Sequence, residues 1–207
     1  MFRKRPKPEA VMRELLYGDV PLERWAENDP VFSAVRGSVA VGDGAQARSV
    51  LHSILASPDR PSRDHLQAWH VLRLLGEEPD DPAYVHGVVV DMPVGKGLDT
   101  LAVYRDGTCR YLNHSGKILV WEASDAGIDA LAADVVAAGA AIASRIGPWI
   151  GPRPPLPQGV LRLSMLCSGG LYFGEGPASA LMADPMAGHL VNASVRLLEA
   201  LTSRAGA

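Results

Sequence analysis

The chain has 207 residues, of which 47% are hydrophobic and 21% are charged. This composition is typical of a globular protein that buries a core without disulfides or a metal. The formal net charge is -3, so there is no excess positive field to hold a phosphate backbone. We therefore expect no nucleic-acid partner.

The cysteine content and the N-terminal residues indicate the compartment. Cys109 and Cys167 are too few for a disulfide scaffold, and their spacing matches no zinc motif. Residues 1–7 are basic, which we interpret as solvated charge, but Glu9 and Arg13 follow where a signal peptide needs apolar residues. No apolar run approaches the length of a membrane span. We expect a cytoplasmic protein without membrane contact, metal or cofactor.

The pattern of residues changes from helical to strand-like near residue 80. Gly76 to Pro82 combines turn-forming residues with four acids, which interrupts any regular element. We place a domain boundary there, with a helical module over residues 1–80 and an antiparallel α+β domain over residues 83–207. The fold class predicted for the whole chain is therefore α+β.

The helical module contains a recognisable helix pair. Val31, Val35 and Val39 lie four residues apart, and the turn Gly42-Asp43-Gly44 precedes a second apolar helical pattern that runs to Leu55. Two shorter helices before this pair are expected within residues 8–17 and 21–27. A further helix is predicted to begin with Ser62 as its N-cap and to stop at Gly76. The stretch from Gly42 to Pro58 resembles the second half of one tetratricopeptide repeat, although a generic helical hairpin explains it equally well.

The second part of the chain begins with strands. Residues 86–92 and 98–104 are predicted strands, and Asp106-Gly107 is a strong hairpin signal before a return strand over residues 108–113. Ser115-Gly116 is either another tight turn or a bulge before residues 117–121. The pattern predicts an antiparallel meander of three long or four shorter strands.

A long apolar helix follows the meander. It is predicted over residues 125–146, with Ser124 as its cap and Gly147-Pro148 as its end. A stiff, proline-rich linker then leads to strands over residues 160–167 and 171–173. A last helix is predicted over residues 186–203. The element order from residue 62 is thus helix, three or four strands, helix, two strands, helix.

The residues that could catalyse a reaction or bind a metal form no recognisable site. His65 and His70 are five residues apart, which places them on different faces of a helix, and His52, His86 and His189 stand alone. The best catalytic set combines Cys167 as nucleophile, His114 as base and the amides of residues 168–170 as oxyanion donors. No family signature surrounds this set, and Cys167 fits a small core residue as well.

Several stretches resemble bacterial proteins that have no assigned activity. The resemblance rests on residues 97–102, 110–117, 145–149 and 151–155 within a similarity that spans most of the chain, and it brings no functional residues with it. At the level of element order, the second part resembles secretion-chaperone-like, profilin-like and roadblock-like domains. Such folds commonly serve as dimeric adaptors, which implies a protein-binding role.

The sequence therefore leads to three hypotheses of function. The first is a non-enzymatic adaptor, chaperone-like or regulatory protein that binds a protein partner or a second copy of itself. The second is a small hydrolase or acyltransferase that uses Cys167 and His114. The third is the sensing of a small ligand between sheet and helix. The hairpin of residues 160–173 is short and almost uncharged, so we also expect its edge to be covered by the N-terminal helices, by a second copy or by a partner.

Overall fold

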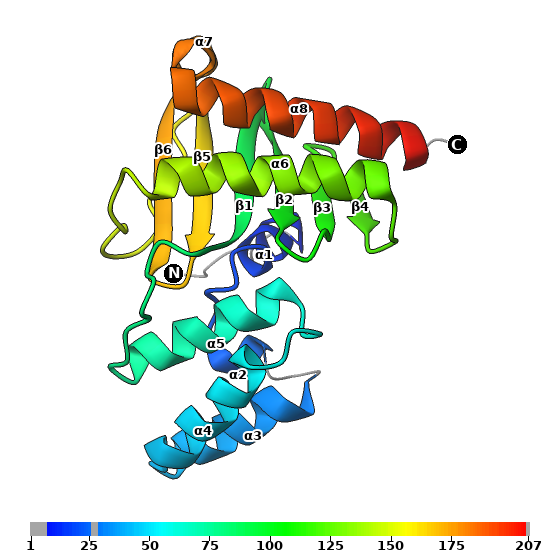
Figure 1. The fold of residues 1–207 in the computed structure, drawn as a ribbon. Helices are drawn as coiled ribbons and strands as arrows, with labels where there is room; N and C mark the ends of the chain where they lie inside the picture. Colours follow the sequence, from blue (N-terminus) through cyan, green and yellow to red (C-terminus); the bar gives the residue numbers. More distant parts are fainter. Residues whose placement is uncertain (1–7, 26–28, 206–207) are drawn as a thin grey trace, which may run out of the picture.

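The computed structural model describes residues 8–25 and 29–205; the basic N-terminal residues discussed above lie outside this part. Figure 1 shows two helices across one face of a six-stranded antiparallel sheet and a group of helices below it. The predicted α+β class is confirmed. The helices are α1 (Pro8–Leu15), α2 (Leu22–Trp25), α3 (Pro30–Ala40), α4 (Gly44–Leu55), α5 (Ser62–Leu74), α6 (Ala126–Ala143), α7 (Ala178–Ala183) and α8 (Pro185–Ala205).

The sheet has the order β4-β3-β2-β1-β5-β6. Its strands are β1 (Val85–Val94), β2 (Gly97–Tyr104), β3 (Cys109–Leu112), β4 (Ile118–Trp121), β5 (Val160–Cys167) and β6 (Gly170–Pro177). The meander therefore has four strands, which resolves the alternative left open by the sequence. The hairpin at Asp106-Gly107 forms as predicted, and β6 is longer than predicted because its pairing with β5 continues to Pro177.

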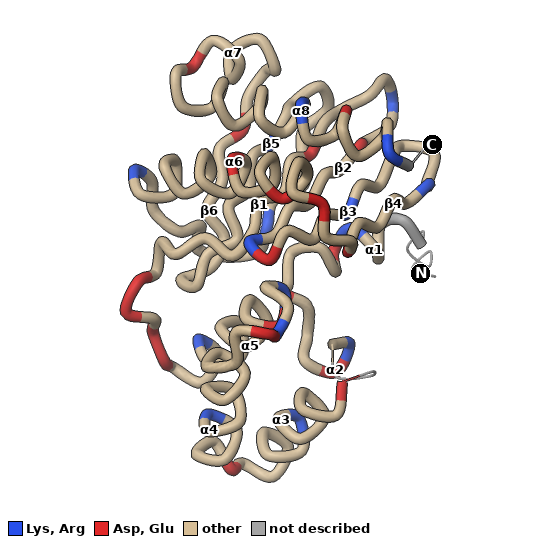
Figure 2. Tube along the Cα trace, turned by 45° about the vertical axis from the view of Figure 1, so that its right-hand side comes forward, with Lys and Arg blue, Asp and Glu red and all other residues tan. Residues whose placement is uncertain are grey.

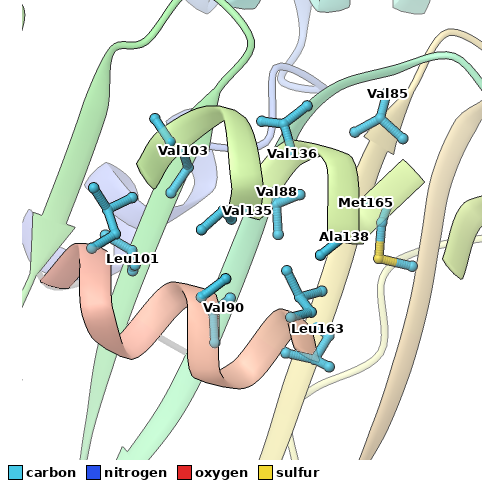
Figure 3. Packing of buried hydrophobic residues seen from close by; sticks show 14 of the residues in the cluster. Val85, Val88, Val90, Leu101, Val103, Val135, Val136, Ala138, Leu163 and Met165 are labelled. Carbon is cyan, nitrogen blue, oxygen red and sulfur yellow. The ribbon is translucent and has the colours of Figure 1, made fainter. Parts of the chain in front are cut away.

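One face of the sheet packs against α6 and α8. Figure 3 shows valine, leucine and methionine side chains of β1, β2 and β5 directed toward these helices. Ile128 and Val135 of α6 are completely buried there, and each such side chain contributes about 1.5–3 kcal/mol of transfer free energy. By length and composition α6 is apolar enough to cross a membrane. In this structure its buried apolar side chains are part of the core.

The ends of α6 differ from the prediction. Its N-cap is Asp125, whose carboxylate accepts hydrogen bonds from the amides of Gly127 and Ile128. The helix ends at Ala143, so Ile146 lies beyond it and is 39% exposed. Ser124 was the wrong cap because the side chain one residue later reaches the free amides of the first turn.

The opposite face of the sheet is covered by the start of the chain. Figure 1 shows α1 behind the sheet, between the strands and α2–α5. Leu16 and Tyr17, which follow α1, are buried against Val89, Ala102 and other side chains of this face. Residues before the predicted boundary thus contribute to the packing of the sheet, and the division into 1–80 and 83–207 stays a prediction.

The remaining helices form a cluster of their own. The predicted hairpin is present as α3 and α4, with Asp43 as the N-cap of α4, and Phe32, Val35 and Leu51 are completely buried between them. Val39 is 40% exposed, so the expected valine face extends over only part of α3. Ser62 is the first residue of α5 and not its cap.

The two outer strands are covered to different extents. On β6, the carbonyl of Leu171 accepts a hydrogen bond from the Trp149 amide, and the Leu171 side chain packs beside Leu16 and Tyr17. On β4, Ile118 and Val120 are 45% and 56% exposed. The chain's own segments therefore protect part of the β6 edge, whereas pairing with a second copy or a partner stays a prediction.

Candidate functional site

Cys167 and His114 lie at opposite ends of the sheet. Cys167 is opposite Val85 at the start of β1, while His114 contacts Gly97, which is opposite Val94 at the end of β1. Nine residues of extended strand separate these positions, or roughly 30 Å at the usual rise of a strand. The structure therefore does not bring the nucleophile and the base of the acyl-transfer hypothesis together.

The surroundings of Cys167 also disfavour nucleophilic chemistry. The side chain is 1% exposed, and burial raises the pKa of its thiol to about 12, so the thiolate is scarce at neutral pH. Two of the three expected oxyanion donors are already used, because the amides of Ser168 and Gly169 donate to the carbonyls of Tyr84 and Pro82 at 3.0 and 2.9 Å. Cys167 is a small core residue.

Ser168 instead meets a histidine that the sequence analysis set aside. The pairing of β1 with β5 shifts register between Val85 and Gly87, and an irregularity of this kind re-aims the side chain within it. The side chain concerned is His86, whose Nε2 lies 2.8 Å from Ser168 Oγ. His65 of α5 stands edge-on to the His86 ring at 6.0 Å between centroids. This cluster lines a hollow of about 450 Å³ between the helices and the sheet.

The Ser168–His86 pair has the distance of a catalytic dyad but not its energetics. Burial, reinforced by the nearby charges of His65, Arg105 and Arg73, lowers the pKa of His86 to about 3. A base this weak takes a proton from a serine hydroxyl with difficulty, because general bases work best with a pKa near the operating pH. Arg73 also donates to the Ser168 carbonyl and holds the turn in place. The pair joins β1 to the β5–β6 turn, and Arg73 joins that turn to α5.

A larger hollow, with a volume of about 850 Å³, lies at the other end of the sheet. It is bordered by α1, the β1–β2 turn, the β3–β4 turn and the segment before β5. The lining residues are Ala10, Arg13, Pro93, Gly95, Lys96, Gly97, Leu98, His114, Leu156, Pro157, Gln158 and Gly159. These residues, all within the described part of the chain, include no Ser, Thr, Cys, Asp or Glu.

Two glycines shape this end of the sheet. Gly95 has φ +58°, which suits the first position of a two-residue hairpin turn and leaves Lys96 at the tip. A Cβ on Gly97 would come within 2.5 Å of the His114 Cβ, so only glycine lets the histidine lie directly against β2. The two turns are thereby held side by side.

His114 is oriented by Asp99 of β2. The carboxylate oxygen Oδ1 lies 2.7 Å from the His114 amide nitrogen and 2.9 Å from His114 Nδ1, and Tyr111 donates to Oδ2. Burial alone would raise the pKa of Asp99, but hydrogen bonds from Tyr111 and His114 outweigh it and lower that pKa below its usual value. Asp99 is therefore an ionised acceptor, which assigns the proton to Nδ1. The opposite nitrogen, Nε2, is turned away from Asp99.

Sequence reasoning found part of this hollow and missed the rest. His114 was named as a candidate, but for a reaction that the structure does not support. Arg13 was considered only as a charge near the start of the chain, and Lys96 was not considered as a site residue. No periodic signal places α1 beside the β1–β2 turn, since that proximity arises from long-range packing. The shift at His86 leaves no trace in the sequence either.

No protein-family model, curated protein or solved structure that we compared with the chain matches it. The resemblances expected from the sequence therefore remain expectations.

Proposed function

We propose that the protein is a non-enzymatic, protein-binding adaptor that receives its partner in the hollow lined by Arg13, Lys96 and His114. The observation that carries this proposal is the composition of that hollow. Its described lining offers cations and apolar walls but no serine, threonine, cysteine or carboxylate, so it suits binding better than acyl-transfer chemistry. The hydrolase alternative finds no support, because Cys167 and His114 lie at opposite ends of the sheet.

The way the helices meet the sheet supports a scaffold role. The α5 helix contacts the sheet through Ser62 and Asp106, through Arg73 and Ser168, and through the pair His65 and His86. The Tyr104 hydroxyl also donates to the carbonyl of Leu16 at 2.7 Å. These contacts join the segment after α1 and the α5 helix to the sheet.

A site-specific cross-link tests the proposal. A photo-reactive amino acid at Gln158, which is exposed and lines the hollow, should capture a reproducible partner in the native host. The matched control is the same amino acid at Glu199, an exposed position on α8. Equal capture from both positions, or from neither, would contradict the proposal.

Self-association is the second part of the adaptor proposal. A second copy is a suitable cover for the exposed Ile118 and Val120 of β4, because an unpaired edge strand is a template for strand addition. Light scattering distinguishes the outcomes: a dimer supports this part, and a monomer of 22.0 kDa at micromolar concentration would oppose it.

A further inference from the structure

The hollow at the β1–β2 end of the sheet presents the hydrogen-bond donors of two cations, and its described lining includes no carboxylate. Arg13 and Lys96 line it from α1 and from the β1–β2 turn, and His114 lines it from the β3–β4 turn. Each of the three comes from a different element, so they surround the space instead of following one surface. Positive and donor groups that converge in this way favour an anionic ligand.

Two carboxylates of the neighbouring strands, Asp91 and Asp99, are turned into the protein. Asp99 accepts hydrogen bonds from Tyr111 and from the amide and ring of His114. Asp91 is 6% exposed and accepts from the hydroxyls of Tyr17 and Thr100, each at 2.7 Å. Both carboxylates are thus occupied by internal donors, and neither lines the hollow.

Two hydrogen bonds to β2 hold the Arg13 guanidinium in place. Its Nε donates to Thr100 Oγ1 at 3.2 Å, and its Nη2 donates to the carbonyl of Leu98 at 2.6 Å. Its Nη1 donates to no other described residue. A guanidinium fixed on one side is well suited to a carboxylate that approaches from the other.

The walls between these donors are apolar. Pro93, Leu98, Leu156 and Pro157 line the same hollow. Apolar walls that alternate with cations match a peptide that carries both acidic and aliphatic side chains. They match nucleic acid poorly, because the described lining contains no Phe, Tyr or Trp for base stacking and the whole chain carries a net charge of -3.

We propose that this hollow binds an extended acidic segment of the partner protein, with its carboxylates on Arg13 and Lys96, a backbone N–H on the acceptor Nε2 of His114 and its aliphatic side chains on the proline and leucine walls. This inference rests on the proposed adaptor function and adds the chemistry of the partner. Asp99 and Tyr111 act as positioning residues, because they orient His114 without lining the hollow.

Fluorescence anisotropy with defined peptides tests the inference on the full chain. A labelled octapeptide of alternating Glu and Leu should bind and should weaken as salt is raised, while an alternating Gln and Leu peptide should bind at least about tenfold more weakly. Short oligothymidine should not compete. Equal binding of the two peptides, or stronger binding of oligothymidine, would overturn the inference.

Charge variants locate the site. Lys96→Glu should weaken binding of the acidic peptide by at least about tenfold, and Lys117→Glu, an exposed reversal in the neighbouring turn that does not line the hollow, should leave it nearly unchanged. Asp99→Asn should weaken binding less than Lys96→Glu, with His114→Gln giving no further loss on top of it. Equal effects of the two lysine variants would refute the assignment. Absence of peptide binding together with persistent cross-linking at Gln158 would reject the acidic ligand and leave the adaptor function standing.

Discussion

Ser62 and Asp106, 44 residues apart in the chain, exchange two hydrogen bonds across the contact between α5 and the sheet. The Ser62 amide donates to Asp106 Oδ2 at 2.6 Å, and the Asp106 amide donates to Ser62 Oγ at 3.1 Å. This arrangement is a capping interaction supplied by another part of the chain, since Pro61 precedes α5 without a capping side chain. The β2–β3 turn thereby fixes the start of α5.

Asp106→Ala should lower the free energy of unfolding by about 1–2 kcal/mol, because it leaves the first-turn amide of α5 without its acceptor. Asp106→Asn keeps one oxygen acceptor and should cost less. Urea unfolding measures both, and hydrogen exchange should show faster exchange at the start of α5 in the alanine variant. An alanine variant as stable as the parent would show that water replaces the carboxylate.

The buried neutral His86 should make the protein sensitive to acid. Its pKa is lowered from 6.5 to about 3 on folding, so the unfolded chain binds a proton more readily. The contribution of neutral His86 to the free energy of unfolding is complete above pH 6.5. It is lost as the pH falls toward 3, and the loss is a few kcal/mol because each pKa unit corresponds to about 1.36 kcal/mol. His86→Gln cannot titrate, so its unfolding free energy should fall less steeply over this range.

Ser168→Ala is the matched control for this pH dependence. It removes the hydroxyl partner of His86 but leaves the imidazole buried and able to titrate. Its stability should be lower at every pH while the steep acid loss persists. A glutamine variant with the same pH profile as the parent would assign the acid sensitivity to other groups.

Two substitutions in α6 should differ in severity. Val135 is completely buried and Leu131 is half-buried, so Val135→Asp should cost several kcal/mol, enough to unfold a typical domain, and Leu131→Asp should cost less. Ala137→Asp, on the exposed side of the same helix, is the control and should cost about 1 kcal/mol or less. Thermal unfolding ranks the three, and an equally harmful Ala137→Asp would place a partner on the outer side of α6.

The thiols should be inert while the protein is folded. Cys109 and Cys167 are both buried, and burial raises the pKa of each to about 12. Labelling by a thiol reagent at pH 8 should be at least about a thousandfold slower than for a free cysteine and should become fast in denaturant. Cys167→Ala should keep the peptide binding expected above. Rapid labelling of Cys167 in the folded protein would reopen the nucleophile hypothesis.

Much of the local structure was accessible from the sequence because local chemistry specifies it. Asp106-Gly107 encodes a hairpin, the apolar spacing around Ile128 and Val135 encodes a buried helix, and the acidic stretch before β1 is seen in Figure 2 as a loop between α5 and the sheet. Helix ends were less predictable. Ser124 and Asp125 are both good capping residues, and only the geometry of the first turn selects between them.

Only the tertiary structure determined which residues far apart in the sequence lie close together. Arg162, an isolated charge in the sequence, is 2% exposed and pairs with Glu175 across β5 and β6. Strand pairing also determines the register shift at His86 and the separation of Cys167 from His114. Long-range packing places α1 beside the β1–β2 turn. Hydrophobic periodicity determines which face of an element is buried, but it carries no information about which other element covers that face. The hollow that we propose as the binding site therefore exists only once the chain has folded.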